Sequence, residues 1–92
     1  MRTFIVMGSH DIKNQFRPDI TLEMHLEDSV ESLLNALNKK YGSNTFIWEA
    51  DQWPAENREA SILEWISESN GDGDWYWMIG EVVGQEFKML LE

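Results

Sequence analysis

The 92-residue chain contains no cysteine, which excludes disulfide bonds and thiolate metal sites. It also lacks a long apolar run near its start, where residues 4–7 (FIVM) are the longest such stretch. A membrane span needs roughly 20 apolar residues, and a signal peptide also needs a longer apolar region than this one. We therefore expect a soluble cytoplasmic protein, in the host cell cytoplasm if a phage encodes it.

Basic residues are scarce. The chain has 7 Lys and Arg against 17 Asp and Glu, which gives a formal net charge of −10. Residues 1–42 carry a net charge of −1, and residues 43–92 carry the remaining −9. Such a charge repels nucleic acid and anionic membranes and attracts basic surfaces. We expect neither direct nucleic-acid binding nor membrane binding.

The sequence also lacks catalytic motifs. Its only histidines are His10 and His25. His10 precedes Asp11, a pair that would orient a general base, but no serine occupies a nucleophile-elbow motif. There is no HExxH zinc motif and no glycine-rich phosphate loop. These absences argue against an enzyme, so we predict no catalytic residues.

One stretch resembles part of a calcium-binding loop. Asn70, Asp72, Asp74 and Glu81 stand at the first, third, fifth and twelfth positions of such a loop. The sixth position should be glycine for the sharp turn, but it is Trp75. We therefore predict a polar turn here, with no metal and no cofactor.

The hydrophobic content, 42% of residues, is sufficient for one folded domain spanning residues 1–92. Residues 4–7 indicate a strand buried on both faces, and residues 9–18 a loop. In the next segment Ile20, Leu22, Met24 and Leu26 alternate with polar residues. This alternation predicts a strand with its apolar side on the core and His25 facing outward.

Helical periodicity follows from residue 30 to 41, with Asp28 as the expected N-terminal cap and Gly42 as the expected end. A third strand is expected over residues 45–49, and a second helix from Pro54 to Asn70. Strands are then expected over residues 75–83 and 86–91, joined at Gly84. The order β-β-α-β-α-β-β predicts an α+β domain: a mostly antiparallel sheet of four to five strands with two helices packed on it.

Two acids, Asp72 and Asp74, directly precede Trp75, Tyr76 and Trp77. On a strand, the two tryptophans point to one side and Tyr76 to the other, so bulky aromatics occupy both faces. Trp and Tyr are favoured anchors in protein interfaces, and nearby carboxylates would steer a basic partner. The predicted partner-binding residues are Glu64, Glu68, Asp72, Asp74, Trp75, Trp77, Glu81 and Glu86.

These features favour a small acidic inhibitor that blocks a nucleic-acid-handling protein by electrostatic and steric competition. Its size and charge are those of phage anti-defence proteins, such as anti-CRISPR and anti-restriction proteins, some of which mimic DNA. An immunity or antitoxin protein that blocks a basic toxin would use the same physics. The third hypothesis is a self-associating ligand-binding or scaffold domain, in which the charge serves solubility and strand edges pair to form a homodimer.

Overall fold

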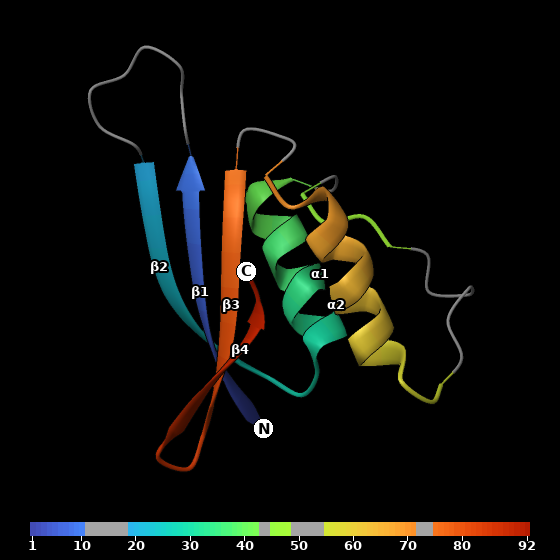
Figure 1. Ribbon diagram of the computed structural model, residues 1–92. Helices are drawn as coiled ribbons and strands as arrows, with labels where there is room; N and C mark the ends of the chain where they lie inside the picture. Colours follow the sequence, from blue (N-terminus) through green and yellow to red (C-terminus); the bar gives the residue numbers. More distant parts are fainter. Residues whose placement is uncertain (11–18, 43–44, 49–54, 72–74) are drawn as a thin grey trace.

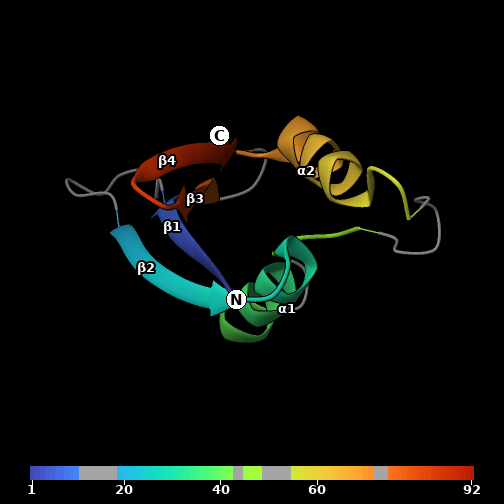
Figure 2. The same ribbon diagram turned by 90° about the horizontal axis from the view of Figure 1, so that it is seen from below.

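The computed structural model describes residues 1–10, 19–42, 45–48, 55–71 and 75–92. These residues form a four-stranded antiparallel sheet in the order β2-β1-β3-β4, with two helices on one side of it (Figures 1 and 2). The elements are β1 (Arg2–His10), β2 (Asp19–Glu27), α1 (Val30–Tyr41), α2 (Arg58–Ser69), β3 (Trp75–Val83) and β4 (Glu86–Leu91). The predicted α+β class is confirmed.

The hydrophobic core lies between the sheet and the helices. Alternate residues of β1 and β3 face it, because strand side chains point to opposite sides in turn. Residues at helical spacing on α1 and α2 close it from the other side. The fully buried large side chains are Phe4, Val6, Val30, Leu33, Leu34, Leu37, Ile62, Ile79 and Leu91.

The N-terminal cap of the first helix lies one residue later than the sequence predicted. Ser29, not Asp28, is the N-terminal cap: its Oγ accepts a hydrogen bond from the Ser32 backbone N–H at 3.1 Å. The Ser32 Oγ accepts in turn from the Ser29 backbone N–H at 3.2 Å. This reciprocal pair satisfies two N–H groups that helical bonding leaves without partners. The predicted end at Gly42 is confirmed, with a φ of 121° that favours glycine.

The predicted strand over residues 45–49 is not found at its described positions, 45–48. The Asn38 side chain provides the reason, because it takes both backbone bonds of Phe46. Its Nδ2 donates to the Phe46 carbonyl at 2.9 Å, and its Oδ1 accepts from the Phe46 N–H at 2.7 Å. The Phe46 ring is buried in the core, although its segment does not form a strand.

The second helix and the last two strands follow the predicted order. α2 begins at Arg58; Pro54, its predicted start, lies outside the described residues. Asn70 and Gly71 end it, as expected, and Gly71 has a φ of 90°. β3 and β4 have the predicted boundaries and join at Gly84. β1 continues through Ser9 and His10, which were predicted to be loop.

The orientation predicted for β2 is wrong. Its register pairs Phe4 with His25 and Val6 with Glu23, which places these polar residues on the side of the helices. Its apolar residues Ile20, Leu22, Met24 and Leu26 point away from the helices and are 55–71% exposed. A one-residue change of register would exchange the two sets, so the pairing with β1 decides which set is exposed.

Candidate protein-binding site

The start of β3 carries a cluster of aromatic rings on the side facing the helices. Trp75 and Trp77 are stacked, with ring centroids 5.3 Å apart and planes at 20°. His10 stacks on Trp75 at 4.7 Å, and the Tyr41 ring meets Trp77 edge-on at 5.1 Å. Trp77 is only 3% exposed, whereas Trp75 is half-buried at the rim of the cluster. Trp75 is therefore the tryptophan of this pair that a partner can reach.

Close packing of Trp77 depends on a glycine in the neighbouring strand. A Cβ atom at Gly8 would lie 2.6 Å from Cζ3 of the Trp77 ring. No real Cβ approaches a ring carbon so closely, so the ring occupies the space that a side chain would take. Gly8 thus leaves room for the indole of Trp77 against β1, and Trp75 stacks on that indole.

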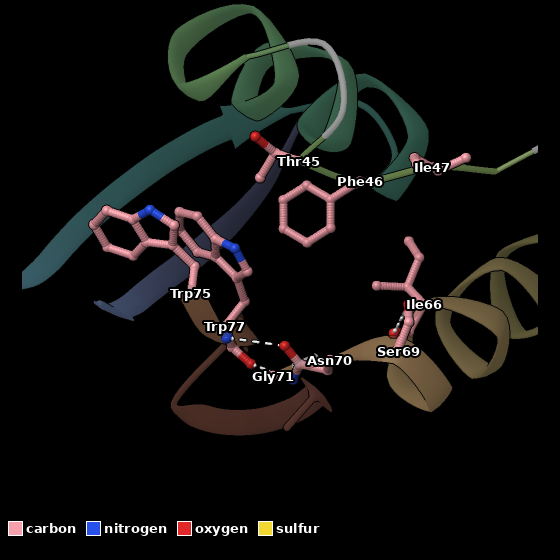
Figure 3. Close-up of a pocket in the computed structure, with 9 residues that line it drawn as sticks. All are labelled: Thr45, Phe46, Ile47, Ile66, Ser69, Asn70, Gly71, Trp75 and Trp77. Carbon is pink, nitrogen blue, oxygen red and sulfur yellow. Dashed lines mark hydrogen bonds between the residues drawn. The ribbon is translucent and has the colours of Figure 1, made fainter. Parts of the chain in front are cut away.

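A cleft of about 210 Å³ opens beside this cluster (Figure 3). It is smaller than typical small-molecule sites, which begin at roughly 300 Å³. The cleft lies between the segment 45–47, the end of α2 and the start of β3. Its lining residues are Thr45, Phe46, Ile47, Ile66, Ser69, Asn70, Gly71, Trp75 and Trp77.

Asn70 holds the two walls of the cleft together. Its Nδ2 donates to the Trp77 carbonyl at 2.8 Å, and its Oδ1 accepts from the Trp77 N–H at 3.0 Å (Figure 3). The bonded side chain therefore fixes the end of α2 against β3. These bonds preorganise this part of the cleft, so less of this chain's conformational entropy would be lost if the cleft were filled.

The last turns of α2 expose two acids around an aromatic ring. Glu64 and Glu68 stand four residues apart, so they share one face of the helix with Trp65, which is 49% exposed. We call Glu64, Trp65 and Glu68 the α2 surface. Neither glutamate forms an ion pair with any residue that the structure describes. Asp72 and Asp74, predicted to belong with them, lie outside the described residues.

Glu81, also predicted to bind a partner, is buried and bound to Arg2. Its carboxylate accepts from Nε and Nη2 of Arg2 at 2.7 and 2.8 Å, and Arg2 also binds Glu59 at 2.7 and 2.8 Å. The hydrogen bonds from Arg2 lower the pKa of Glu81, although burial opposes that change. The hydrogen bonds to Glu81, followed in size by those to Glu59, raise the pKa of Arg2. Both carboxylate oxygens of Glu81 are therefore bonded within the protein.

The predicted residues therefore divide into groups. Trp75 borders the cleft, and Glu64 and Glu68 lie on α2, whose C-terminal end forms one wall of it. Trp77 lies beneath Trp75 in the core, so it supports the site from within. Glu86 is exposed at the β3–β4 turn, at the opposite end of the sheet from Trp75 (Figure 1).

Arg58 and Lys40 are also bound to carboxylates. Arg58 binds Glu31, with Nη2 and Oε2 3.1 Å apart. Lys40 and the Tyr41 hydroxyl both donate to Glu23. Burial raises the pKa of Glu23, but these hydrogen bonds outweigh it and lower the pKa.

His25 belongs to the same group, with Nε2 3.4 Å from Glu23 Oε1. The sequence predicted it to face outward, beside Glu23 and Glu27. Instead it lies on the helix side of β2, where its side chain is 18% exposed. On this face of β2, Glu23 accepts hydrogen bonds from Lys40 and Tyr41 at the end of α1, whereas the buried Nε2 of His25 has no hydrogen-bond partner among the described residues.

Within the described ranges, no three His, Asp or Glu side chains gather closely enough to hold a metal ion. None of the helices described is long and apolar enough to cross a membrane. No protein-family model, curated protein or solved structure matches this chain.

Proposed function

We propose that this protein is a non-catalytic inhibitor that binds the basic surface of a nucleic-acid-handling protein. One observation carries the proposal: the α2 surface exposes two carboxylates beside a tryptophan, on the helix that ends at a preformed aromatic cleft. The carboxylates would occupy positions where a partner normally holds phosphates. Trp65 and Trp75 would supply apolar contact, since tryptophan is enriched among the residues that dominate binding energy.

The pairing of charges supports this use of α2. Arg2, Lys40 and Arg58 each bind carboxylates of other elements, so they contribute little attraction for acids of a partner. Glu64 and Glu68 have no such partners among the described residues. Both carboxylates can therefore attract a basic protein, and the association rate would fall as salt rises.

The phage anti-defence type, anti-CRISPR or anti-restriction, is the class we propose within this function. Small size, a net charge of −10 and an exposed acidic surface support it. An immunity or antitoxin protein would use the same surface against a basic toxin. The identity of the bound partner distinguishes the two, because a restriction or CRISPR complex would support the anti-defence protein and a toxin would support the immunity protein.

The experiment is affinity capture from a bacterial lysate, followed by competition with the purified captured protein. We expect the captured protein to bind or cleave nucleic acid, and we expect this chain to reduce that activity in proportion to occupancy. Glu64→Lys combined with Glu68→Lys should weaken the inhibition by about tenfold or more, because a close charge pair across an interface contributes 1.4 kcal/mol or more.

The matched control is Asp28→Lys combined with Glu86→Lys, two exposed acids away from the cleft. Each reversal adds two charges, so both double variants have a net charge of −6 rather than −10. The control should inhibit like the parent protein. Equal losses in the two variants would mean that net charge alone acts, and nucleic-acid binding unaffected by the chain would refute the inhibitor.

A further inference from the structure

The sheet has a second apolar face, on the side away from the helices. Strand pairing arranges its residues in rows across the sheet: Leu22, Met7 and Met78 form one, and Met24, Ile5, Gly80 and Met89 the next. We call this side the outer face. It comprises Thr3, Ile5, Met7, Ser9, Ile20, Leu22, Met24, Leu26, Tyr76, Met78, Gly80, Val82, Phe87 and Met89.

No described element covers the outer face (Figure 2). Ile5 and Met7, which the sequence predicted to be fully buried, are half-buried there. The Phe87 ring lies over Gly80, where a Cβ atom would be 2.0 Å from its Cζ. The ring thus fills the gap that glycine leaves, and the apolar surface continues from β2 across to β4.

The outer face carries no charged side chain, although 26% of the residues in the chain are charged. Eight of its large side chains are between 38% and 71% exposed. Their exposed area is on the order of 900 Å², close to the roughly 800 Å² that each partner contributes to a standard interface. Apolar patches of this size on a soluble protein indicate contact with another molecule.

We propose that the outer face binds the outer face of a second copy, forming a symmetric homodimer in which two sheets pack together. A two-fold interface brings the same surface of both copies together, so that surface must be complementary to itself. The outer face meets this condition. It is uncharged and apolar, so contact between two copies places no carboxylates against each other. A basic partner protein would find no acid there to bind.

The resulting dimer would be a sandwich with the helices on its two outer sides. Stacked sheets lie about 10 Å apart, with side chains from both inner surfaces forming one core. The methionines at positions 7, 24, 78 and 89 suit such a contact, because their unbranched side chains adapt to a facing surface. Both α2 surfaces would remain exposed, so dimerisation is independent of the proposed inhibition.

The test is the molar mass of the purified full chain in solution, measured by light scattering and sedimentation without any partner. We expect twice the chain mass of 10.8 kDa at micromolar concentrations. Val82→Lys and Leu22→Lys should each raise the dimer dissociation constant by about tenfold or more, because a lysine would lose its hydration in an apolar contact.

Val83→Lys is the matched control, since Val82 and Val83 are adjacent in β3 and point to opposite sides of the sheet. Val83 is 57% exposed and Val82 is 38% exposed, so both replacements should fold, which circular dichroism will verify. The control should remain dimeric. A monomeric parent protein would overturn the proposal, whether or not its outer face binds an apolar dye.

Pairing between strand edges gives a different result. Val82 lies on β3, a central strand, so Val82→Lys would leave an edge-to-edge dimer intact. A parent dimer that survives Val82→Lys would therefore refute the face-to-face arrangement and favour edge pairing.

Discussion

Arg2 shows how one residue joins distant parts of the chain. Its guanidinium binds Glu81 of β3 and Glu59 of α2, and its carbon Cζ lies 5.0 Å from the centre of the Phe4 ring. The sequence placed Arg2 near the N-terminus and Glu81 in a predicted binding surface, with no pattern to connect them. Only the pairing of β1 with β3 brings the two together, so this contact could not be read from local spacing.

We predict that Arg2→Gln destabilises the protein at pH 7 and that the loss becomes smaller as pH falls. In the parent, the folded-state pKa of Glu81 is below its ordinary value of 4.5. The contribution of Glu81 to stability is therefore complete above that value and is lost as pH falls through the lowered pKa. Without Arg2, the buried carboxylate favours its protonated form, so acid would no longer weaken it.

Denaturant unfolding at pH 7 and pH 4 measures this effect. The variant should lose about 2 kcal/mol at pH 7, because the Glu81 carboxylate loses the charged hydrogen-bond donors of a partly exposed ion pair. Glu81→Gln in the same background should restore part of the loss. If the variant loses the same free energy of unfolding at both pH values, the ionisation of Glu81 does not depend on Arg2.

At the scale of the elements, the N-terminal cap of α1 can be tested directly. Ser29→Ala should lower the free energy of unfolding by about 1 kcal/mol, because it removes the acceptor for the Ser32 N–H. Asp28→Ala, the control, should cost only a few tenths, as expected for a charge near a helix end. Equal effects, measured by chemical denaturation, would contradict the assignment of Ser29 as the cap.

The elements that the sequence predicted well are those with a strong local pattern. The spacing of Leu33, Leu34 and Leu37 defines α1, and the run of aromatic and branched residues defines β3. The face of β2 could not be predicted, because alternation shows that two faces differ without showing which one the helices cover. The Asn38 side chain likewise bonds the backbone of Phe46 in place of strand pairing. No local sequence pattern predicts this contact.

The candidate site was predicted only in part, for a related reason. Composition identified acids and aromatics in the second half of the chain, and the structure places Glu64, Glu68 and Trp75 on neighbouring elements. The sequence could not decide which of Trp75 and Trp77 is core, and it could not indicate that Arg2 binds Glu81. Exposure depends on which elements pack together, and that is decided by contacts between residues far apart in the sequence.

At the scale of the whole molecule, the net charge of −10 acts with opposite signs on the two proposed interfaces. Two copies repel each other over distances comparable to the Debye length, about 30 Å at 0.01 M salt and 8 Å at 0.15 M. A basic partner is attracted over the same distances. Salt screens both effects, so it should strengthen dimerisation and weaken inhibition.

We therefore predict that raising salt from about 0.01 M to 0.15 M lowers the dimer dissociation constant severalfold, because the repulsion is screened while the apolar contact is retained. Sedimentation at the two salt concentrations measures this change. Glu64→Lys with Glu68→Lys reduces the net charge and leaves the outer face unaltered, so its dimer should depend less on salt. A dimer that weakens as salt rises would have charged groups across its interface, which the outer face does not contain.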